Sequence, residues 1–221
     1  MKLAIVTGAN SEIGITIIKK LLSLNYFVIG CIHKNNERIK KIENANLKIK
    51  KIDLTNEEEI IQLLENKKVD VIVNVAAYYY DDYYYEVTKE DFIKALEVNV
   101  VAPFLLFKYA NMNNGKIINI SSTDGIDTYN ELNIPYSASK AALNNLTQSL
   151  AYLKEKAEVY AIALGWVNTE MIRAINQDYL KIEMERANQK DLIPLEKVAE
   201  IVENILNSKY ENGSIIRIDG E

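Results

Sequence analysis

The chain has 221 residues, 48% of them hydrophobic and 26% charged, a composition typical of one globular domain with a sizeable core. Its net charge of −5 argues against a general nucleic-acid binder, and no apolar run reaches the roughly 18 residues that a membrane span requires. A single cysteine excludes an internal disulfide, and with a single histidine it argues against a metal site. Since the first motif follows the N-terminus directly, no signal peptide is predicted, and we expect a cytoplasmic protein.

Strands and helices are predicted to alternate along the chain. Apolar runs rich in β-forming residues predict strands at residues 2–6, 27–32, 47–52, 69–75, 116–121, 159–164 and 214–218. Helices are predicted at residues 15–24, 56–66, 90–111, 136–156 and 195–207, and a short helical lid at 172–193. The β-branched run 69–75 is typical of a strand buried on both faces. We therefore predict an α/β fold, a single Rossmann-type domain over residues 1–221 with helices on both faces of a doubly wound parallel sheet.

The first strand runs into a glycine-containing loop, Thr-Gly-Ala-Asn-Ser-Glu-Ile-Gly, at residues 7–14. Gly8 permits a tight turn, and Gly14 permits close approach of the following helix to the strand or to a ligand. Asn10 and Ser11 can cap that helix, whose free N–H groups suit a pyrophosphate. An ordinary capped turn is the alternative, but the strand–loop–helix context favours nucleotide binding.

The end of the second strand carries basic residues where a dinucleotide fold selects its cofactor. An acidic residue there would accept hydrogen bonds from the adenosine ribose, and none is present. His33, Lys34 and Arg38 offer donor or positive groups instead, which predicts NADP(H) rather than NAD(H). The alternative is a solvated basic turn.

Further polar residues follow the ends of later strands. Asp53 follows the third strand and Asn74 ends the fourth. Because ligands bind at the carboxyl ends of parallel strands, we expect these residues to gather with Gly8 and His33 on one edge of the sheet.

Residues 78–85 hold six of the chain's fourteen tyrosines. Since they follow the fourth strand, Tyr78, Tyr79 and Tyr80 are predicted to line an apolar substrate pocket near the ligand edge. A protein contact and a compositional bias are equally consistent with this segment.

Tyr136 and Lys140 stand four residues apart near the start of a predicted helix, which puts both side chains on one helix face. A phenol with a pKa near ~10 exchanges protons poorly at neutral pH, and a neighbouring ammonium lowers that pKa. Alone, the pair is either a proton-transfer device or chance. Asn99 lies in mid-helix, where asparagine is unfavourable, so we expect its side chain to bond elsewhere or to have a functional role.

Together these motifs resemble the short-chain dehydrogenase/reductase family over nearly the whole chain. Residues 7–14 resemble its cofactor loop, and Tyr136 with Lys140 resembles its catalytic pair. Ser122 stands 14 residues before Tyr136, close to the family's spacing for a catalytic serine. Further matches, in family order, are Asp53-Leu54, Asn74-Val75-Ala76-Ala77, Asn99, Gly165, Thr169 and Gly220.

The resemblance implies reversible hydride transfer between a nicotinamide and a carbonyl or alcohol. Tyr136 would then donate a proton to the carbonyl oxygen, while Lys140 would lower the pKa of Tyr136 and hold the nicotinamide ribose. Ser122, with Ser121 as the alternative, would orient the carbonyl, and Asn99 would anchor a water that connects Lys140 to solvent. The predicted cofactor contacts are Gly8, Asn10, Ser11, Ile13, Gly14, His33, Lys34, Asp53, Leu54, Asn74, Ala76, Tyr136, Lys140, Gly165, Val167 and Thr169.

Three positions depart from the family pattern. Glu12 replaces the middle glycine of the cofactor loop, Ala77 replaces a glycine after the fourth strand, and Leu164 replaces a proline. A carboxylate beside a pyrophosphate is unfavourable, so we expect the Glu12 side chain to point to solvent.

The resemblance implies an NADP(H)-dependent carbonyl reductase, with a 3-oxoacyl thioester, which could be carrier-bound, as the first expectation. No basic cluster for an acidic carrier protein is evident, and a small ketone, sugar or polyketide substrate fits equally well. The alternative is a catalytically inactive family member that senses NADP(H) and acts through its tyrosine-rich surface. The helices predicted at 90–111 and 136–156 resemble the family's dimer faces, which implies a homodimer or homotetramer.

Overall fold

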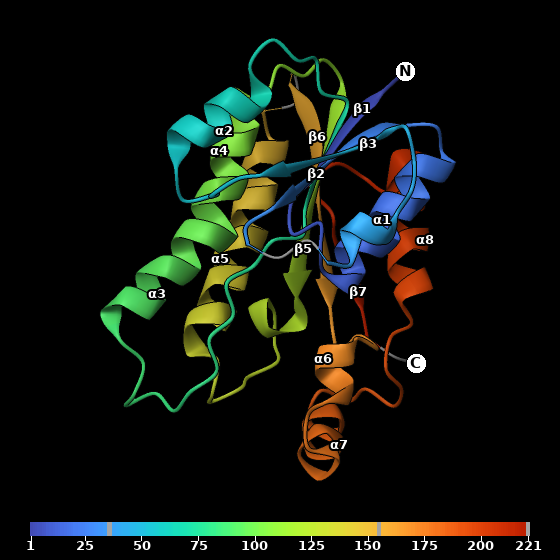
Figure 1. Cartoon of the computed structure of the whole chain (residues 1–221). Helices are drawn as coiled ribbons and strands as arrows, with labels where there is room; N and C mark the ends of the chain where they lie inside the picture. The colour runs from blue at the N-terminus through green and yellow to red at the C-terminus, as the bar shows by residue number, and fades with distance from the viewer. Residues whose placement is uncertain (35–36, 154–155, 220–221) are drawn as a thin grey trace.

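The computed structural model describes residues 1–34, 37–153 and 156–219, and a seven-stranded sheet forms its centre (Figure 1). The strand order is β3-β2-β1-β4-β5-β6-β7, and all neighbouring strands are parallel. The strands are β1 (Leu3–Val6), β2 (Phe27–Ile32), β3 (Leu47–Lys51), β4 (Val71–Asn74), β5 (Gly115–Ser122), β6 (Ala157–Leu164) and β7 (Ile215–Ile218). The order reverses direction between β1 and β4, which confirms the predicted doubly wound α/β fold.

Helices cover both faces of the sheet, α1 and α8 on one face and α2, α4 and α5 on the other. The α-helices are α1 (Glu12–Ser23), α2 (Glu57–Leu64), α3 (Lys89–Leu96), α4 (Ala102–Tyr109), α5 (Ile134–Ala151), α6 (Glu170–Arg173), α7 (Gln177–Arg186) and α8 (Leu195–Leu206). Short helical turns of other types are η1 (Ile39–Lys41), η2 (Glu97–Val101) and η3 (Thr123–Gly125). Within the described ranges, no helix is long and apolar enough to cross a membrane.

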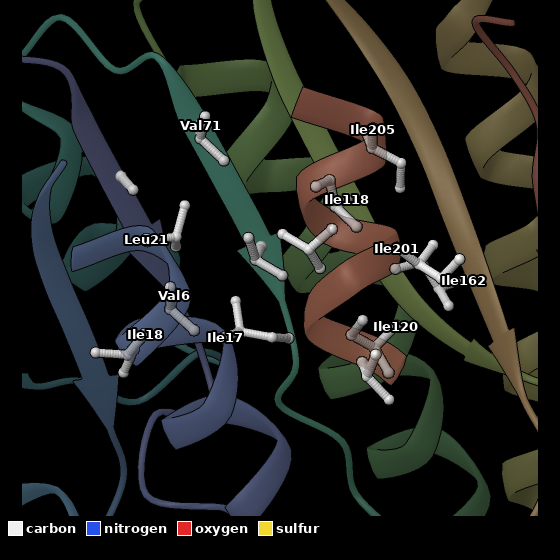
Figure 2. Close-up of a cluster of buried hydrophobic side chains, with 14 of the residues drawn as sticks. Val6, Ile17, Ile18, Leu21, Val71, Ile118, Ile120, Ile162, Ile201 and Ile205 are labelled. Carbon is white, nitrogen blue, oxygen red and sulfur yellow. The ribbon is translucent and has the colours of Figure 1, made fainter. Parts of the chain in front are cut away.

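Two hydrophobic cores follow from the pleat of the strands. Because successive side chains of a strand point to opposite faces, Val6 packs under α1 and α8 whereas Ile5 packs under α2 and α4. Figure 2 shows the first of these cores, in which α1 and α8 lay their isoleucines and Leu21 on β-branched residues of β1, β4, β5 and β6.

The segment predicted as one helix at 90–111 is a helix with an internal wide turn. α3 leads into η2, a π-helical turn that contains Asn99, and α4 follows without a break. A π turn shifts the helix register by one residue, which a 3.6-residue apolar period does not reveal. The predicted lid is also divided, into the short helices α6 and α7.

A buried ladder of polar side chains fixes α5 against the centre of the sheet. Asn74 Nδ2 donates to Asn119 Oδ1 at 2.8 Å, and Asn119 Nδ2 donates to Thr147 Oγ1 at 2.8 Å. Thr147 Oγ1 in turn donates to the Leu143 carbonyl at 2.8 Å. All three polar side chains are buried. The ladder therefore holds the helix that carries Tyr136 in a fixed register on β4 and β5.

Replacing Asn119 with alanine is expected to lower the free energy of unfolding by about 2–4 kcal/mol, because it removes two buried hydrogen bonds and leaves the Asn74 amide without its acceptor. Urea unfolding monitored by circular dichroism measures this loss. Asn145→Ala, at an exposed position of α5, serves as the control and should change stability by less than about 0.5 kcal/mol. Equal stabilities of the two variants would contradict the structural role of the ladder.

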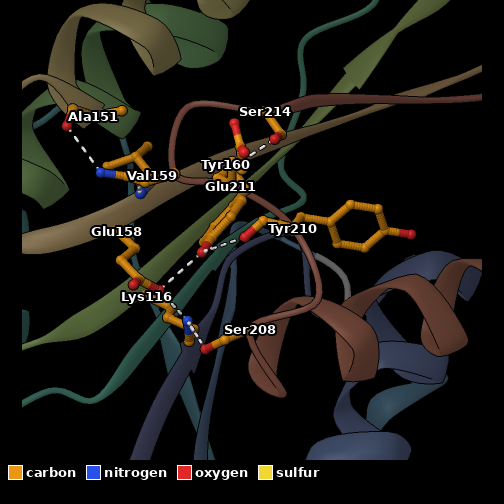
Figure 3. A network of polar contacts seen from close by, with 10 residues as sticks. Lys116, Ala151, Glu158, Val159, Tyr160, Ser208, Tyr210, Glu211 and Ser214 are labelled. Atoms are coloured by element: carbon orange, nitrogen blue, oxygen red, sulfur yellow. Dashed lines mark hydrogen bonds and ion pairs between the residues drawn. The ribbon is translucent and has the colours of Figure 1, made fainter.

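Polar contacts also tie together the amino ends of β5 and β6, away from the carboxyl edge (Figure 3). Lys116 pairs with Glu158 and donates to Ser208 Oγ at 3.1 Å, and the Tyr160 hydroxyl donates to Glu158 Oε2 at 2.8 Å. Asn212 joins the loop before β7 to β6 by accepting from the Val159 N–H at 2.8 Å. These contacts hold together the amino ends of β5 and β6. A large cavity lies at the opposite edge of the sheet, where the strands have their carboxyl ends.

Candidate active site

A cavity of about 1570 Å³ lies at the carboxyl ends of the strands. Its wall contains residues that follow β1, β2, β3, β4, β5 and β6, as expected for a doubly wound sheet. Gly8, His33 and Asp53 line it together, in agreement with the expectation that these strand ends meet.

Most of the predicted site residues line this cavity. Those in its wall are Gly8, Asn10, Ser11, Ile13, His33, Lys34, Asp53, Leu54, Ala76, Tyr78, Tyr79, Ser122, Tyr136, Lys140, Gly165, Val167 and Thr169. Gly14, Asn74, Asn99 and Tyr80 are outside the wall. Asn74 belongs to the buried ladder instead, and Gly220 lies outside the described residues.

The loop after β1 is shaped by its glycines. Gly8 has φ +61°, and a Cβ there would lie 2.6 Å from the Ala76 nitrogen, while a Cβ on Gly14 would lie 2.5 Å from the Gly8 carbonyl oxygen. Ser11 Oγ caps α1 by accepting from the Gly14 N–H at 3.0 Å. Glu12 and Ile13 stand between Ser11 and Gly14. In the described part of the chain, no acceptor is hydrogen-bonded to their backbone N–H groups. These open donors at a helix N-terminus fit the pyrophosphate of a dinucleotide.

The expectation that Glu12 points to solvent is wrong. Its side chain is 23% exposed, and Oε2 accepts from the backbone N–H of Glu170 at 2.5 Å. Oε1 lies 3.6 Å from the Arg173 guanidinium. The start of α6 supplies a donor and a positive charge, which satisfy the carboxylate better than a position in solvent beside the loop.

Two of the three basic residues after β2 lie near carboxylates. His33 Nε2 lies 4.0 Å from Asp53 Oδ2, and the Arg38 guanidinium pairs with the Glu170 carboxylate. Lys34 is exposed, with no ion-pair partner among the described residues. Asn10 Oδ1 accepts from the Arg38 N–H at 3.0 Å, so this side chain positions the segment after β2.

Tyr136 lies in the cavity wall at the start of α5, with Ser122 beside it. Burial raises the pKa of Tyr136, the nearby Asp124 carboxylate raises it further, and a hydrogen bond with Ser122 lowers it. The net direction is upward, whereas the sequence predicted that Lys140 would lower this pKa. The reason is that the phenol is desolvated and that the ammonium bonds elsewhere.

Lys140 is buried one helical turn after Tyr136. Its Nζ donates to the Ile120 carbonyl at 2.7 Å and lies 5.3 Å from the centre of the Tyr136 ring. Burial lowers the pKa of Lys140 to about 8, because the protein interior disfavours the ammonium. A lysine with this pKa can exchange a proton near neutral pH.

The two adjacent serines at the end of β5 differ in their surroundings. Ser121 Oγ lies 3.4 Å from the Lys140 carbonyl and donates to the α5 backbone. Ser122 is hydrogen-bonded to Tyr136 and also accepts from the Asp124 N–H at 3.2 Å. This difference favours Ser122 as the serine that acts together with Tyr136.

Asp124 and Asn133 were missed in the sequence. The Asn133 amide donates to Asp124 Oδ2 at 3.1 Å, and both residues line the cavity near Tyr136. Burial raises the pKa of Asp124, although the Asn133 hydrogen bond lowers it in part. The position of Asp124 two residues beyond Ser122, at a strand's carboxyl end, was the available signal.

Asn99 uses its whole amide group to fix the tyrosine segment. Oδ1 accepts from the Tyr78 N–H at 2.7 Å, and Nδ2 donates to the Tyr78 carbonyl at 3.0 Å and to Ser139 Oγ at 2.8 Å. Both amide hydrogens are therefore engaged, which leaves none to donate to the predicted water. The buried asparagine joins η2, α5 and the chain after β4.

Replacing Asn99 with alanine is expected to lower the free energy of unfolding by about 2–4 kcal/mol and to raise amide exchange over residues 78–85, because the Tyr78 backbone loses both partners. Hydrogen-exchange mass spectrometry measures the second effect. Asn99→Asp keeps the acceptor for the Tyr78 N–H but turns a buried carboxylate oxygen towards the Tyr78 carbonyl, so it should raise exchange over residues 78–85 at least as much as the alanine variant. An unchanged exchange rate in Asn99→Ala would contradict this positioning role.

The tyrosine segment divides into two parts. Tyr78 and Tyr79 line the cavity, and the Tyr79 ring packs edge-on against Tyr136 with 5.1 Å between ring centres. Tyr83, Tyr84 and Tyr85 are exposed and pack on one another, with the outer two rings stacked at 5.5 Å. The first part is consistent with the predicted pocket wall, and the second part forms outer surface.

Comparisons with known proteins identify the family of the chain. Residues 2–180 match the family model described as short chain dehydrogenase. The chain is 33% identical to a 3-oxoacyl-[acyl-carrier-protein] reductase of Rickettsia felis, over 99% of this chain and 95% of that protein. It is 30% identical to 2-dehydro-3-deoxy-D-gluconate 5-dehydrogenase of Bacillus subtilis, over 99% and 93%. The structure of a 4-hydroxyisoleucine dehydrogenase complexed with NADH is similar, with a TM-score of 0.86, 29% identity and coverage of 100% and 98%.

Proposed function

The chain belongs to the short-chain dehydrogenase family, and from this premise we propose that it is an NADP(H)-dependent oxidoreductase that reduces a carbonyl to an alcohol. The observation that carries the proposal is the meeting of Tyr136, Ser122 and Lys140 in one cavity with the glycine loop after β1. A nicotinamide dinucleotide held there would supply the hydride. The open N–H groups of Glu12 and Ile13 would hold its pyrophosphate.

The side chains of the protein would donate and replace the proton that the carbonyl oxygen takes up. Tyr136 would donate its hydroxyl proton to the carbonyl oxygen, and its raised pKa keeps the hydroxyl protonated at neutral pH, as this direction requires. Ser122 would hydrogen-bond the same oxygen and orient it. Lys140, with a pKa of about 8, would return a proton towards Tyr136 and hold the ribose hydroxyls. Asn99 would position Tyr78 through its amide group and would anchor the water that connects Lys140 to solvent through an acceptor oxygen.

The preference for NADP(H) rests on Lys34, which is exposed after β2 without an ion-pair partner among the described residues, and on the absence of an acid at that position. Fluorescence titration with NADPH and NADH tests it. Tighter binding of NADPH is expected, and tighter binding of NADH would overturn the preference.

A 3-oxoacyl thioester is the first substrate class, because the similar proteins include a 3-oxoacyl-[acyl-carrier-protein] reductase. A small polar ketone with hydroxyl or ammonium groups is the second, because Asp124 adds a carboxylate acceptor close to Tyr136. The 2-dehydro-3-deoxy-D-gluconate and 4-hydroxyisoleucine dehydrogenases are named for substrates of this polar kind.

NADPH oxidation with acetoacetyl-CoA and with simple ketones, and NADP⁺ reduction with the polar ketone 2-dehydro-3-deoxygluconate, whose C5 alcohol is the group that a 5-dehydrogenase oxidises, test the function and separate the two substrate classes. Turnover of the thioester alone supports the first class, and turnover of the polar ketone alone supports the second. Tight NADPH binding without oxidation by any carbonyl compound would instead favour a sensor that acts through exposed tyrosines.

The apolar stripe along α3, η2 and α4 supports a homo-oligomer. Ile93, Val101 and Phe104 are each more than 40% exposed along this helical stretch. We expect a dimer or tetramer in sedimentation velocity, and a monomer at micromolar concentration would rule this interface out.

A further inference from the structure

Four charged residues from three separate segments link the start of α1 to the start of α6. Glu12 accepts from the Glu170 N–H at 2.5 Å and lies 3.6 Å from the Arg173 guanidinium. Arg38, from the segment after β2, pairs through its guanidinium with the Glu170 carboxylate. We call Glu12, Arg38, Glu170 and Arg173 the latch, and the helices α6 and α7 (residues 170–186) the lid.

Three of the four latch residues line the cavity, and their side chains are partly exposed to solvent. Glu12, Arg38 and Glu170 belong to the cavity wall, beside the loop that would receive the pyrophosphate. Arg173 is held in place because its guanidinium donates to the Asn168 carbonyl at 3.0 Å and to Asn168 Oδ1 at 2.8 Å. The start of the lid is thus joined to α1 through Glu12 and to the segment after β2 through Arg38.

The Arg38 side chain has freedom to change partner. Its backbone N–H is fixed to Asn10 Oδ1 at 3.0 Å, but its side chain is 44% exposed and its bond to Glu170 lies at the surface. A guanidinium binds a phosphate through two parallel hydrogen bonds, and a phosphate monoester carries about −1.5 to −2 charges against one for a carboxylate. A phosphate near the end of β2 would therefore compete with Glu170 for Arg38.

We propose that the latch couples cofactor choice to the lid: a 2′-phosphorylated adenosine takes Arg38 away from Glu170, and the lid is then held by Glu12 and Arg173 alone. A cofactor without the 2′-phosphate leaves the latch complete. Arg38 and Glu170 are specificity-determining residues in this scheme, and Glu12 is a positioning residue. The inference rests on the proposed dinucleotide function.

Two adenosine ligands that lack nicotinamide test the coupling without any reaction. In hydrogen-exchange mass spectrometry, 2′,5′-ADP should raise amide exchange over residues 170–173 about two- to fivefold relative to 5′-ADP, the range expected for loss of an exposed ion pair. Equal exchange with the two ligands at saturation would overturn the proposal.

Glu170→Gln removes the competitor for Arg38. This variant should bind 2′,5′-ADP about two- to fivefold more tightly, bind 5′-ADP as the wild type does, and lose the difference in lid exchange between the ligands. The matched control is Glu185→Gln, an exposed carboxylate of α7 outside the latch, which should change neither affinity. An equal effect of Glu170→Gln on both ligands, or no effect on either, would overturn the role of Glu170.

Glu12→Gln tests the other half of the latch in the ligand-free protein. Loss of the charge facing Arg173 should raise amide exchange over residues 170–173 about two- to fivefold before any nucleotide is added. An unchanged exchange rate would contradict the positioning role of Glu12. Failure of the proposed function is separately visible. No binding of either ADP contradicts both proposals, whereas NADPH-dependent turnover with a lid insensitive to 2′,5′-ADP contradicts the latch alone.

Discussion

Replacing Tyr136 with phenylalanine is expected to lower kcat by about 10²–10⁴-fold, the usual contribution of a general acid in the transition state. The change removes only the hydroxyl. The ring, which packs against Tyr79 at 5.1 Å and lies near Lys140, keeps its place, so the fold and the dinucleotide affinity should be retained. Steady-state oxidation of NADPH with an active carbonyl substrate measures the loss, and fluorescence titration measures the retained affinity.

Tyr79→Phe is the matched control for this prediction. Tyr79 lines the same cavity and touches Tyr136, and burial raises the pKa of its hydroxyl as it does for Tyr136. It has no place in the proposed proton transfer, so its loss should lower kcat less than about tenfold. Unchanged turnover in Tyr136→Phe, or an equal loss of kcat in the two variants, would contradict the assignment of Tyr136 as the general acid.

The fold was predictable because its signals are local in sequence. Each strand is a run of β-forming residues, and the run predicted at 69–75 contains β4, which is buried throughout. The alternation with amphipathic helices then restricts the sheet to a parallel, doubly wound form. The π-helical turn at Asn99 was not predicted, because one wide turn barely disturbs the apolar period of a helix. This turn is stabilised by the hydrogen bond between Asn99 and Tyr78, which lie 21 residues apart.

The sequence predicted which residues form the site better than it predicted their pKa values and contacts. Residue spacing and position at strand ends were enough to indicate Ser122, Tyr136 and Lys140. The direction of the Tyr136 pKa depends instead on how deeply the phenol is buried and on Asp124, neither of which the spacing reveals. Likewise, Glu12 finds its partner 158 residues away at Glu170, a distance over which sequence pattern carries no information.

The same burial makes Lys140 costly to the ligand-free fold. Lys140→Met is expected to abolish turnover and yet raise the free energy of unfolding at pH 7 by about 1–3 kcal/mol, since one pKa unit is worth about 1.4 kcal/mol and the pKa falls from 10.5 to about 8. Loss of the hydrogen bond to the Ile120 carbonyl offsets part of the gain. Urea unfolding of both proteins at pH 7 measures the difference.

The pH dependence separates this explanation from a simple gain in packing. Below the folded-state pKa of about 8, Lys140 is charged in both states, and the native state bears the whole cost of burying the ammonium. Between about 8 and 10.5 the unfolded chain binds more protons than the native one, so the wild type gains stability relative to Lys140→Met as pH rises. The advantage of the variant should therefore be greatest below pH 8 and vanish towards pH 10.5. Lys19→Met, at an exposed position of α1, should show no such trend, and an advantage of Lys140→Met that stays constant from pH 7 to 10 would show that burial of the charge is not its cause.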